Sequence, residues 1–598
     1  AWQQGRIIAY RVLAQLFLPG AGVVNQPETR TQTVTIRSFH LLLVLLALMM
    51  TACTGEQEVV ETTAPISALT VTAGVQTMPI SEGWGYWENS ARDVEQARAQ
   101  NQWQAIDLPH TWNAFDATDA SPGYRRAGSW YRKALEIPND DEGLRYILYF
   151  EGANMTADVY VNGDRAGGHV GGYLGFDVDI TDYLEKGGVN TVLVRVDNGV
   201  NPDLIPTQKA DVVIYGGLSR DVFLKVRPPV FVDRVFIDTP AVSAEEAATN
   251  VRVSVKSYRE PGALTLDVAI LDTKGETVME ARQNIEIKAG ESVVAIEMPT
   301  LESPALWHVD DPVLYRAEAR LSDASGNVID TRAERFGYRW FEFRPHGAFY
   351  LNGERLLLRG THLHEEFAGV GNAMSNEQHR ADMEQIKGVG ANFVRIGHYS
   401  HDPSVYEAAD ELGLLLWDEV PWNRGGAGGD TWKRNTLRLL GEMIQQNRNH
   451  PSVIIWSLGN EVYWLPDFEG GGEPHKLKSV ISEMNELAHI LDPSRSTAIR
   501  KVAAVQDIVD VYSPSIWAGW YGGGYHQYGP AITAAQEEHP RLLHVEYGGS
   551  SHVGRHTVTP HGGDGLKGGQ VSVAEAVAQA GVKSVAKGGN WDESYIVD

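Results

Sequence analysis

The chain has 598 residues, of which 43% are apolar and 21% are charged, and this ordinary globular composition excludes a wholly disordered protein. Its 51 basic and 77 acidic residues give a net charge of −26, which excludes the basic surface that non-specific nucleic-acid binding requires. The length predicts about three or four domains. Cys53 is the single cysteine, so neither an intramolecular disulfide nor a cysteine-based zinc site can form.

The N-terminal residues have the pattern of a targeting signal. Residue 1 is alanine and the first methionine is Met49, so 1–38 is expected to be an over-extended reading frame. The apolar run 41–50 is too short to cross a membrane, and it leads into Met50-Thr51-Ala52-Cys53, which resembles a bacterial lipoprotein box. We predict a signal over 1–53, a lipid anchor on Cys53 at the bacterial cell envelope and a tether over 54–80. A plain signal peptide is the alternative.

Two β domains are predicted next, over 81–225 and 226–335. Short apolar runs alternate with turn signals in the first of them, and Asn162-Gly163 is typical of a tight hairpin because that turn requires positive φ angles. The second segment has strand-like runs at the spacing of a β-sandwich. The runs in the two segments are Tyr146–Phe150, Ala157–Val161 and Thr191–Val196, then Val251–Val255, Leu264–Leu271 and Ala317–Leu321.

From 336 onward, strands alternate with helices, which predicts a (β/α)₈ barrel over 336–598. Ser375 opens a capping box, Asp402-Pro403 begins a helix, and Gly413 is placed to end it. Helical spacing also runs over Val480–Leu491. The predicted strands are Leu356–Gly360, Asn392–Ile396, Leu414–Trp417, Val453–Ser457, Thr497–Ile499, Val509–Tyr512 and Leu542–Val545.

Two glutamates stand at the carboxyl ends of predicted barrel strands, where barrel enzymes place their chemistry. Asn460-Glu461 follows the fourth strand and Glu546 follows the seventh. A pair of carboxyl groups facing one glycosidic bond is what retaining glycoside hydrolysis requires, one as acid/base and one as nucleophile. A structural ion pair is the alternative for either residue alone.

A set of short motifs is spread over residues 81–598. The motifs are Asp107–Trp112, Tyr215–Val222, Leu306-Trp307, Asp311–Tyr315, Phe336–Arg339, Asn352-Gly353, Leu358–Gly360, Val394-Arg395, His398-Tyr399, Trp417–Glu419, Gly459–Glu461 and Glu546–Gly548. In combination they resemble glycoside hydrolase family 2, the family of β-galactosidases and β-glucuronidases. The resemblance implies a jelly-roll sugar-binding domain over 81–225, an immunoglobulin-like domain over 226–335 and a catalytic barrel over 336–598. It also implies Glu461 as acid/base and Glu546 as nucleophile.

The same resemblance implies further substrate-binding residues. Asn460 is expected to bind the sugar 2-hydroxyl, and Asp211 to reach a sugar hydroxyl from the jelly roll. His364 and His398 are expected to contact substrate at the barrel mouth, with a structural hydrogen bond as the alternative for each. Trp517 takes the place of a tyrosine that the family often has near the nucleophile.

Two departures from the family pattern bear on the fold and on metals. The stretch Pro421–Arg424 offers no pair of acidic or histidine ligands where some galactosidases hold magnesium, so no metal is predicted, and no cofactor is predicted either. Nothing after Glu546 has the pattern of a final buried strand carrying the family's pocket tryptophan. The eighth strand and its helix are therefore expected to be missing.

The function we predict from the sequence is that of a retaining, exo-acting β-glycosidase, with β-galactosidase as the first choice by analogy. The same family leaves β-glucuronidase, β-mannosidase and glucosaminidase open. A non-catalytic surface sugar-binding protein and a metal-dependent barrel hydrolase using His362-Leu363-His364 are further alternatives. The expected partner is a glycoside or oligosaccharide, with no nucleic acid, with membrane contact only through the anchor, and with a homo-oligomer left open.

Overall fold

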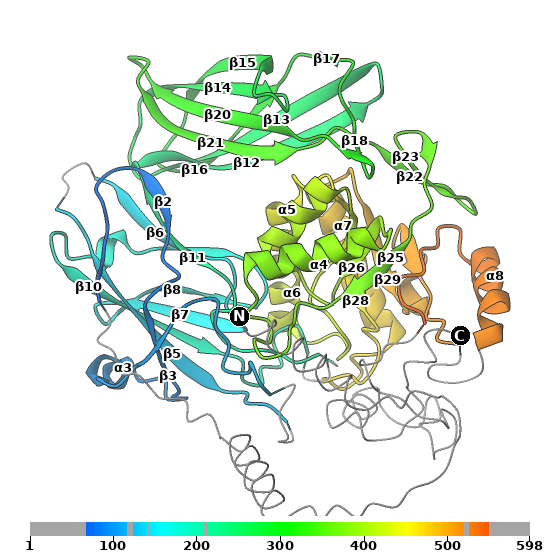
Figure 1. Ribbon diagram of the computed structural model, residues 1–598, viewed down its shortest axis with the longest axis horizontal. Coiled ribbons are helices and arrows are strands. Elements are labelled where there is room, and N and C mark those ends of the chain that lie inside the picture. The colour runs from blue at the N-terminus through cyan, green and yellow to red at the C-terminus, as the bar shows by residue number, and fades with distance from the viewer. Residues whose placement is uncertain are drawn as a thin grey trace, which may run out of the picture. The chain divides into compact units, whose positions relative to one another are not determined.

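The computed structural model describes residues 67–116, 123–139, 143–207, 210, 212–518 and 525–548. Within these residues the chain forms two β-sandwiches and a curled parallel sheet flanked by helices, coloured from blue to orange in Figure 1. Three predictions lie outside the described residues: the signal and lipid anchor ending at Cys53, the substrate-binding role of Asp211, and the missing strand after Glu546.

The first β-sandwich is the predicted jelly roll, and its core is a single cluster of buried apolar side chains between two sheets. One sheet contains β1 (Leu69–Thr70), β3 (Trp84–Trp87), β4 (Gln104–Ile106), β5 (Gly128–Glu136), β7 (Thr156–Val161), β8 (Asp164–Val170) and β10 (Val189–Asp197). The other contains β2 (Gln76–Pro79), β6 (Arg145–Phe150), β9 (Phe176–Asp179) and β11 (Val222–Arg227). Two short helices, α3 (Val94–Ala99) and η1 (Thr181–Tyr183), join strands.

Two sequence expectations for this domain have different outcomes. The predicted hairpin turn is confirmed, since Asn162 and Gly163 connect β7 to β8 with φ angles of 54° and 105°. The span predicted as a tether, 54–80, contributes two strands, because β1 pairs with β5 and β2 pairs with β11. Apolar residues such as Val71 and Ile80 enter the sandwich core, which explains why residues 69–80 fold with the domain.

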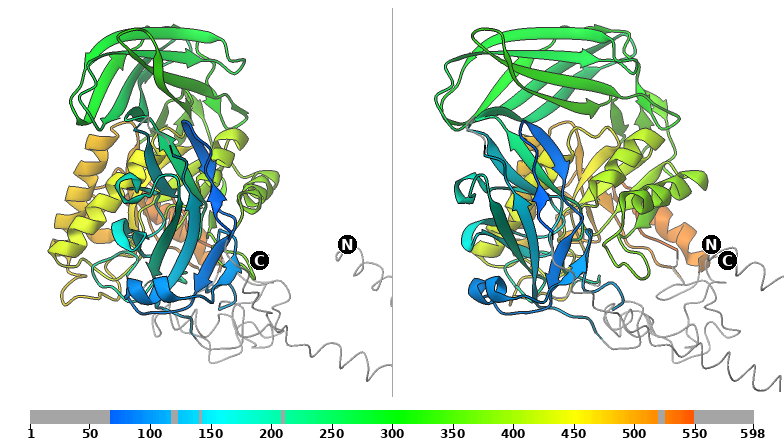
Figure 2. Two further views of the ribbon diagram at one scale, coloured as in Figure 1. Left: turned by 90° about the vertical axis from the view of Figure 1, so that its left-hand side faces the viewer. Right: turned by 60° about the vertical axis from the view of Figure 1, so that its left-hand side comes forward.

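The second β-sandwich has the predicted immunoglobulin-like form, and Figure 2 shows its sheets as two layers. One layer is β12 (Val230–Val242), β13 (Glu246–Ser257), β16 (Gly290–Glu297) and β17 (Leu301–Glu302). The other is β14 (Ala263–Leu271), β15 (Thr277–Glu286), β20 (Tyr315–Asp323) and β21 (Val328–Phe336). Buried residues alternate with partly accessible ones along β14, as expected of strands that bury one face. A two-stranded ribbon, β18 (Trp307–His308) with β19 (Asp311–Pro312), follows.

Within its described residues, the third domain contains six parallel strands in sequence order, which form a half-barrel. They are β25 (Gly360–Leu363), β26 (Phe393–Ile396), β27 (Leu415–Glu419), β28 (Val453–Asn460), β29 (Ser496–Arg500) and β30 (Val511–Ser513). A small antiparallel sheet precedes them: β22 (Phe341–Phe343), β23 (Phe349–Leu351) and β24 (Glu354–Arg355). The first predicted barrel strand, Leu356–Gly360, is therefore placed too early, because its residues follow that small sheet and pairing with β26 begins only at Gly360.

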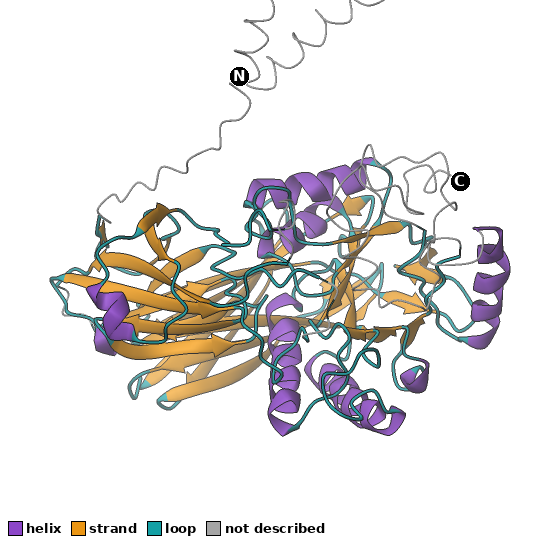
Figure 3. Ribbon diagram, turned by 90° about the horizontal axis from the view of Figure 1, so that it is seen from below, coloured by secondary structure: helices purple, strands orange, loops and turns teal. Residues whose placement is uncertain are grey.

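The helices of the third domain flank the parallel sheet (Figure 3). They are α4 (Asn376–Gly388), α5 (Pro403–Leu412), α6 (Asp430–Asn447), α7 (Pro474–Leu491) and α8 (Tyr528–Glu538), with the short turns η2 (Ala503–Val505) and η3 (Tyr525–Gln527). Both predicted N-terminal caps are confirmed, since Ser375 makes a capping box on α4 and Asp402 caps α5. Gly413 ends α5 with a φ of 69°, as the sequence predicts.

The seventh predicted barrel strand is only partly formed. Leu543 donates a backbone hydrogen bond to Tyr512 at 3.1 Å, and Tyr512 donates one to Arg541 at 3.0 Å, so the segment runs beside β30. A single parallel bridge joins Tyr512 to Leu542. Val545 packs with inward side chains such as Trp417 and Ile455, which places the residue before Glu546 inside the curled sheet.

Candidate active site

Glu461 and Glu546 come together at the carboxyl ends of the parallel strands. The Nη1 atom of Arg500 lies 3.2 Å from Oε1 of Glu461 and 2.9 Å from Oε2 of Glu546. Since both oxygens contact one nitrogen, they can be at most about 6 Å apart, a limit that lies below the 6.5–9.5 Å range of inverting glycosidases and is compatible with the 5–5.5 Å of retaining ones. Arg500 is the last residue of β29, so the strand order itself places it between the two carboxylates.

The backbone turns sharply where two neighbouring strands end at this site. Glu461, just after β28, has a φ of 49°, and Lys501, just after β29, has a φ of 54°. Non-glycine residues adopt this left-handed region only when the surrounding structure holds them there, and such residues cluster at functional sites. Here the Glu461 amide donates to the Arg500 carbonyl at 3.1 Å, and the Lys501 amide donates to the Ser513 carbonyl at 2.8 Å.

Three cations surround the Glu461 carboxylate. Lys501 Nζ donates to Oε1 at 2.8 Å, Arg424 Nε donates to Oε2 at 3.1 Å, and Arg500 lies within ion-pair distance. The side chain of Glu461 is only 4% exposed. Burial by itself raises the pKa of Glu461, but Arg500, Lys501 and Arg424 outweigh it and lower that pKa to about 2. The carboxyl group is therefore ionised at neutral pH in this state.

Glu546 is held by a second, connected set of charges. Arg395 Nη1 donates to Glu546 Oε2 at 2.7 Å, and Nη2 of the same arginine contacts Glu419 at 3.0 Å. Glu419 is fully buried and also accepts hydrogen bonds from Trp417 Nε1 at 3.0 Å and Ser457 Oγ at 2.8 Å. Burial would raise the pKa of Glu419, but Arg395 and its other partners hold that pKa well below its usual range. Glu419 thus fixes the arginine that orients Glu546.

Asn460 lies between the two carboxylates and is tightly held. Its Oδ1 accepts from Arg395 at 3.1 Å and from Arg500 at 2.9 Å, while its Nδ2 donates to Asn423 Oδ1 at 2.9 Å. An amide nitrogen carries two hydrogens, so one remains for a further acceptor such as a sugar hydroxyl. The geometry suits the role that the resemblance implies for Asn460.

His364 and His398 lie together at the ends of β25 and β26, with His362 beside them. The ring centroids of His362 and His364 are 4.6 Å apart, and those of His364 and His398 are 5.4 Å apart. His398 Nδ1 lies 2.7 Å from Glu419 Oε1, so this nitrogen makes a hydrogen bond within the protein. The three rings bring nitrogens within 4.8 Å of one another, and such a group could hold a metal ion. A second group with equally close ligand atoms is formed by the buried residues Glu365, His379 and Asp402.

Two predicted substrate-binding residues remain, Trp517 and Asp211. Trp517 is half-buried on the segment that follows β30, at the same end of the sheet as Arg500. Asp211 lies outside the described residues, but nearby residues of its motif contact the barrel. Tyr215 donates to Glu366 at 2.9 Å, and Arg220 Nη2 donates to the buried Glu365 at 2.7 Å. These contacts bring the jelly-roll loop to the barrel residues just after β25.

Sequence reasoning missed the positive charges of the site. It gave no role to Glu419, Arg395, Arg424, Arg500 or Lys501, although Arg395 and Glu419 stood within quoted motifs. Their position was the available signal, because Arg500 and Lys501 end the fifth strand as Glu461 follows the fourth. Arginine and lysine at the barrel strand ends, considered beside the acids, point to Arg395, Arg500 and Lys501, whereas Arg424 lies in the loop after β27.

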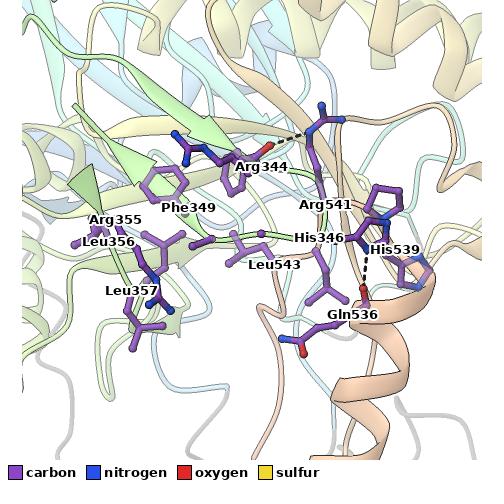
Figure 4. Close-up of a pocket in the computed structure, with 16 residues that line it drawn as sticks. Arg344, His346, Phe349, Arg355, Leu356, Leu357, Gln536, His539, Arg541 and Leu543 are labelled. Atoms are coloured by element: carbon purple, nitrogen blue, oxygen red, sulfur yellow. Dashed lines mark hydrogen bonds between the residues drawn. The ribbon is translucent and has the colours of Figure 1, made fainter. Parts of the chain in front are cut away.

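The structure also has a pocket of about 420 Å³ with a different lining, and Figure 4 shows the side chains that line it. It is lined by residues that precede β25 and by the stretch from Gln536 to Leu543, including Arg344, His346 and Arg541. None of the carboxylates or cations of the candidate active site lines it.

No helix in the described part of the chain has both the length and the apolar composition of a membrane span.

Comparison with known proteins matches all three domains of the chain. Residues 85–228 match the sugar-binding domain of glycosyl hydrolases family 2, residues 230–339 match the family's central domain, and residues 343–558 match its TIM barrel domain. A β-glucuronidase of Bacteroides fragilis is 31% identical over 476 residues, covering 76% of this chain and 67% of that protein.

Two further relatives are more similar in sequence. A protein of Formosa agariphila, provisionally named a β-glucuronidase, is 52% identical over 519 residues, covering 87% of this chain and 62% of that protein. The crystal structure of Parabacteroides merdae β-glucuronidase superposes with a TM-score of 0.76 at 37% identity, covering 81% of this chain and 65% of that one. The chain therefore spans less than two thirds of the length of these two relatives.

The two sandwiches and the parallel sheet with carboxylates at its strand ends define a multidomain glycoside hydrolase fold. The chain belongs to glycoside hydrolase family 2, as the motifs predicted. The first choice of substrate made from the sequence is wrong: these relatives are β-glucuronidases, so a β-galactosidase is the less favoured member. That choice had rested on analogy and on no residue of the site.

Proposed function

We propose that the chain carries the catalytic site of a retaining β-glucuronidase, which releases a terminal β-linked uronic acid from a glycoside. The observation that supports it most directly is the shared contact of Glu461 and Glu546 with one nitrogen of Arg500, at 3.2 and 2.9 Å. Glucuronide, rather than another β-glycoside, is favoured by the 52% identity to the Formosa agariphila protein.

In the proposed mechanism the two carboxyl groups act in turn. Glu546 attacks the anomeric carbon while the bond to the leaving oxygen breaks, and Glu461 gives that oxygen its proton. Glu461 then takes a proton from water, whose oxygen attacks the same carbon and releases Glu546. Two inversions leave the product in the β configuration. Arg395 holds the Glu546 carboxylate in place through its 2.7 Å hydrogen bond, and Asn460 is positioned for the sugar 2-hydroxyl.

A panel of p-nitrophenyl β-glycosides, assayed with the full-length gene product, tests the proposal. The glucuronide should be hydrolysed with the highest kcat/KM, and proton NMR of the early product should show the β anomer. Faster hydrolysis of the galactoside, mannoside or glucosaminide would refute the glucuronidase assignment. An α product would refute the retaining mechanism.

A separate proposal concerns location: we infer from the Met50–Cys53 sequence that the mature protein is tethered to the cell envelope through a lipid on Cys53. Labelled palmitate should enter the wild type and should be lost in Cys53→Ala. Equal labelling of both would leave only an ordinary signal peptide.

A further inference from the structure

Cations crowd the carboxylates of the candidate site. Four of them, Arg395, Arg424, Arg500 and Lys501, contact the described carboxylates Glu419, Glu461 and Glu546. When Glu461 takes up the proton that its proposed role requires, the negative charge that faces these cations falls by one. A substrate that brings its own negative charge would restore it.

Lys501 is the cation placed to meet such a charge. Its side chain is 33% exposed, whereas the side chains of Arg395, Arg424 and Arg500 are only 1–2% exposed. Arg500 is also fixed by hydrogen bonds to Asn460 and to Ser515. A lysine ammonium is a compact charge on a flexible stem, so it can change partners more easily than a buried, multiply bonded guanidinium.

The position of Lys501 indicates which part of the substrate it would meet. Glu461 as acid/base must contact the glycosidic oxygen, so the Nζ that lies 2.8 Å from Glu461 Oε1 is also close to that oxygen. On the protein surface beside it stand two aromatic residues that follow Glu461 in the chain. Trp464 has Lys501 Nζ 4.8 Å from its ring centroid, and Tyr463 is 38% exposed. Flat aromatic faces of this kind can pack against a sugar ring.

We propose that Lys501, with Tyr463 and Trp464, forms a subsite for a negatively charged leaving group, the sugar on the far side of the scissile bond. The proposal rests on the proposed function of Glu461 as acid/base. The ammonium pairs with Glu461 in the free protein and turns to a carboxylate or sulfate ester of the bound substrate. The substrate class is then an acidic oligosaccharide with anionic groups on the leaving sugar, in addition to the terminal uronate.

This exchange of partners also resolves a difficulty in the mechanism. A carboxyl group with a pKa of about 2 is almost entirely ionised at neutral pH and cannot serve as an acid. Drawing Lys501 away from Glu461 removes one of the three cations responsible, while Arg424, Arg500 and the nearby Tyr463 remain. Binding of an anionic leaving group would therefore raise the pKa of the acid at the moment when its proton is needed.

Three aryl β-glucuronides with matched leaving groups test the proposal: 4-(carboxymethyl)phenyl, 4-(sulfomethyl)phenyl and the neutral 4-(carbamoylmethyl)phenyl glucuronide. We expect the full-length wild type at low salt to prefer the two anionic compounds in kcat/KM by about three- to tenfold. Lys501→Met should bring this ratio to about one, and Lys501→Arg should keep most of it. Lys476→Met removes an exposed lysine whose Nζ donates a hydrogen bond to the Glu469 carbonyl, and it should leave the ratio unchanged.

Two further measurements keep the test decisive. If turnover is too slow to follow, the affinities of the same compounds for Glu546→Gln, measured by calorimetry, should show the same ratio and the same loss with Lys501→Met. A wild type without preference, or a preference that survives Lys501→Met, would overturn the subsite. If another glycoside is hydrolysed instead of glucuronides, the proposed function fails, and the ratio is measured on that sugar with the same leaving groups.

Discussion

Glu461 and Glu546 lie within reach of the same arginine, but their surroundings differ. Glu461 is 4% exposed and contacts three cations, whereas Glu546 is 17% exposed and contacts two arginines that other buried groups hold in place. In the proposed mechanism Glu461 must carry a proton and Glu546 must not. The carboxyl group that needs the proton is thus the one with more positive neighbours. In the free protein the Glu461 carboxyl group is therefore ionised. In the proposed mechanism, substrate binding must change its surroundings so that it takes up a proton.

The largest expected effect comes from removing either carboxylate. Glu546→Gln should abolish turnover of every substrate, because an amide cannot attack the anomeric carbon. Glu461→Ala should still form the glycosyl-enzyme from an activated aryl glycoside but should stall before its hydrolysis. Added azide needs no base, so it should restore turnover in Glu461→Ala and yield the β-glycosyl azide, which NMR identifies.

The azide product also shows whether the two roles are correctly assigned. Azide that rescues Glu546→Gln to the inverted α-azide would leave the assignment standing. An α-azide from Glu461→Ala would mean that Glu461 is the nucleophile and that the comparison above is reversed.

A smaller but still large effect is expected from neutralising Glu419, which contacts Glu546 through Arg395. Glu419→Gln takes away the charge that fixes Arg395, so Glu546 should be misplaced and kcat should fall by about 10²-fold. KM should change little, since Glu419 is fully buried and acts through the arginine. Steady-state kinetics checks this split, and circular dichroism confirms that the variant folds. A rise in KM with unchanged kcat would contradict the positioning role.

Lys501→Met should change the pH profile of the acid/base residue. With one of its three cations gone, the pKa of Glu461 should rise from about 2, by about one unit or more. The basic limb of kcat/KM for a neutral aryl glucuronide, which reports the acid in the free enzyme, should move to higher pH by the same amount. Lys476→Met is the matched control and should leave the limb in place. A shift to lower pH would contradict the electrostatic account.

The smallest effect concerns stability in acid. Because the pKa of Glu461 is lowered from 4.5 to about 2 in the folded protein, its ionised form stabilises the fold above pH 4.5, and this contribution is lost as pH falls towards 2. Urea unfolding at several pH values should show a steeper loss in the wild type than in Glu461→Gln over this window. Equal slopes would indicate that the cations do not act on Glu461 in solution.

The sequence predicted the scaffold of this site better than its charges. Alternation of apolar residues and the caps at Ser375, Asp402 and Gly413 predicted helices that the structure contains. The strand-end rule selected Glu461 and Glu546 because barrel enzymes place their chemistry at the carboxyl ends of strands. The contacts of Arg500 with both carboxylates, by contrast, depend on how β28, β29 and the segment after β30 are arranged in space. No spacing along the chain records that arrangement.

The errors have physical causes as well. The strand predicted at Leu356–Gly360 was placed too early because Leu356 and Leu358 pack against the inward cluster that contains Phe349, although pairing with β26 begins only at Gly360. The substrate was misjudged because the conserved mechanism of a family leaves its sugar specificity to other residues.

The bend at the end of β28 has a consequence for anyone who searches genomes or redesigns this enzyme. Consecutive residues of a strand point to opposite faces, yet Asn460 and Glu461 both contact Arg500 Nη1. The bend that allows this uses Gly459, whose φ is 145°, and a Cβ there would lie 2.6 Å from Val462 Cγ1 and 2.9 Å from the Trp422 carbonyl. The position of the glutamate in Gly-Asn-Glu therefore depends on the glycine. A homologue that keeps Asn-Glu but replaces the glycine is expected to place its glutamate side chain elsewhere.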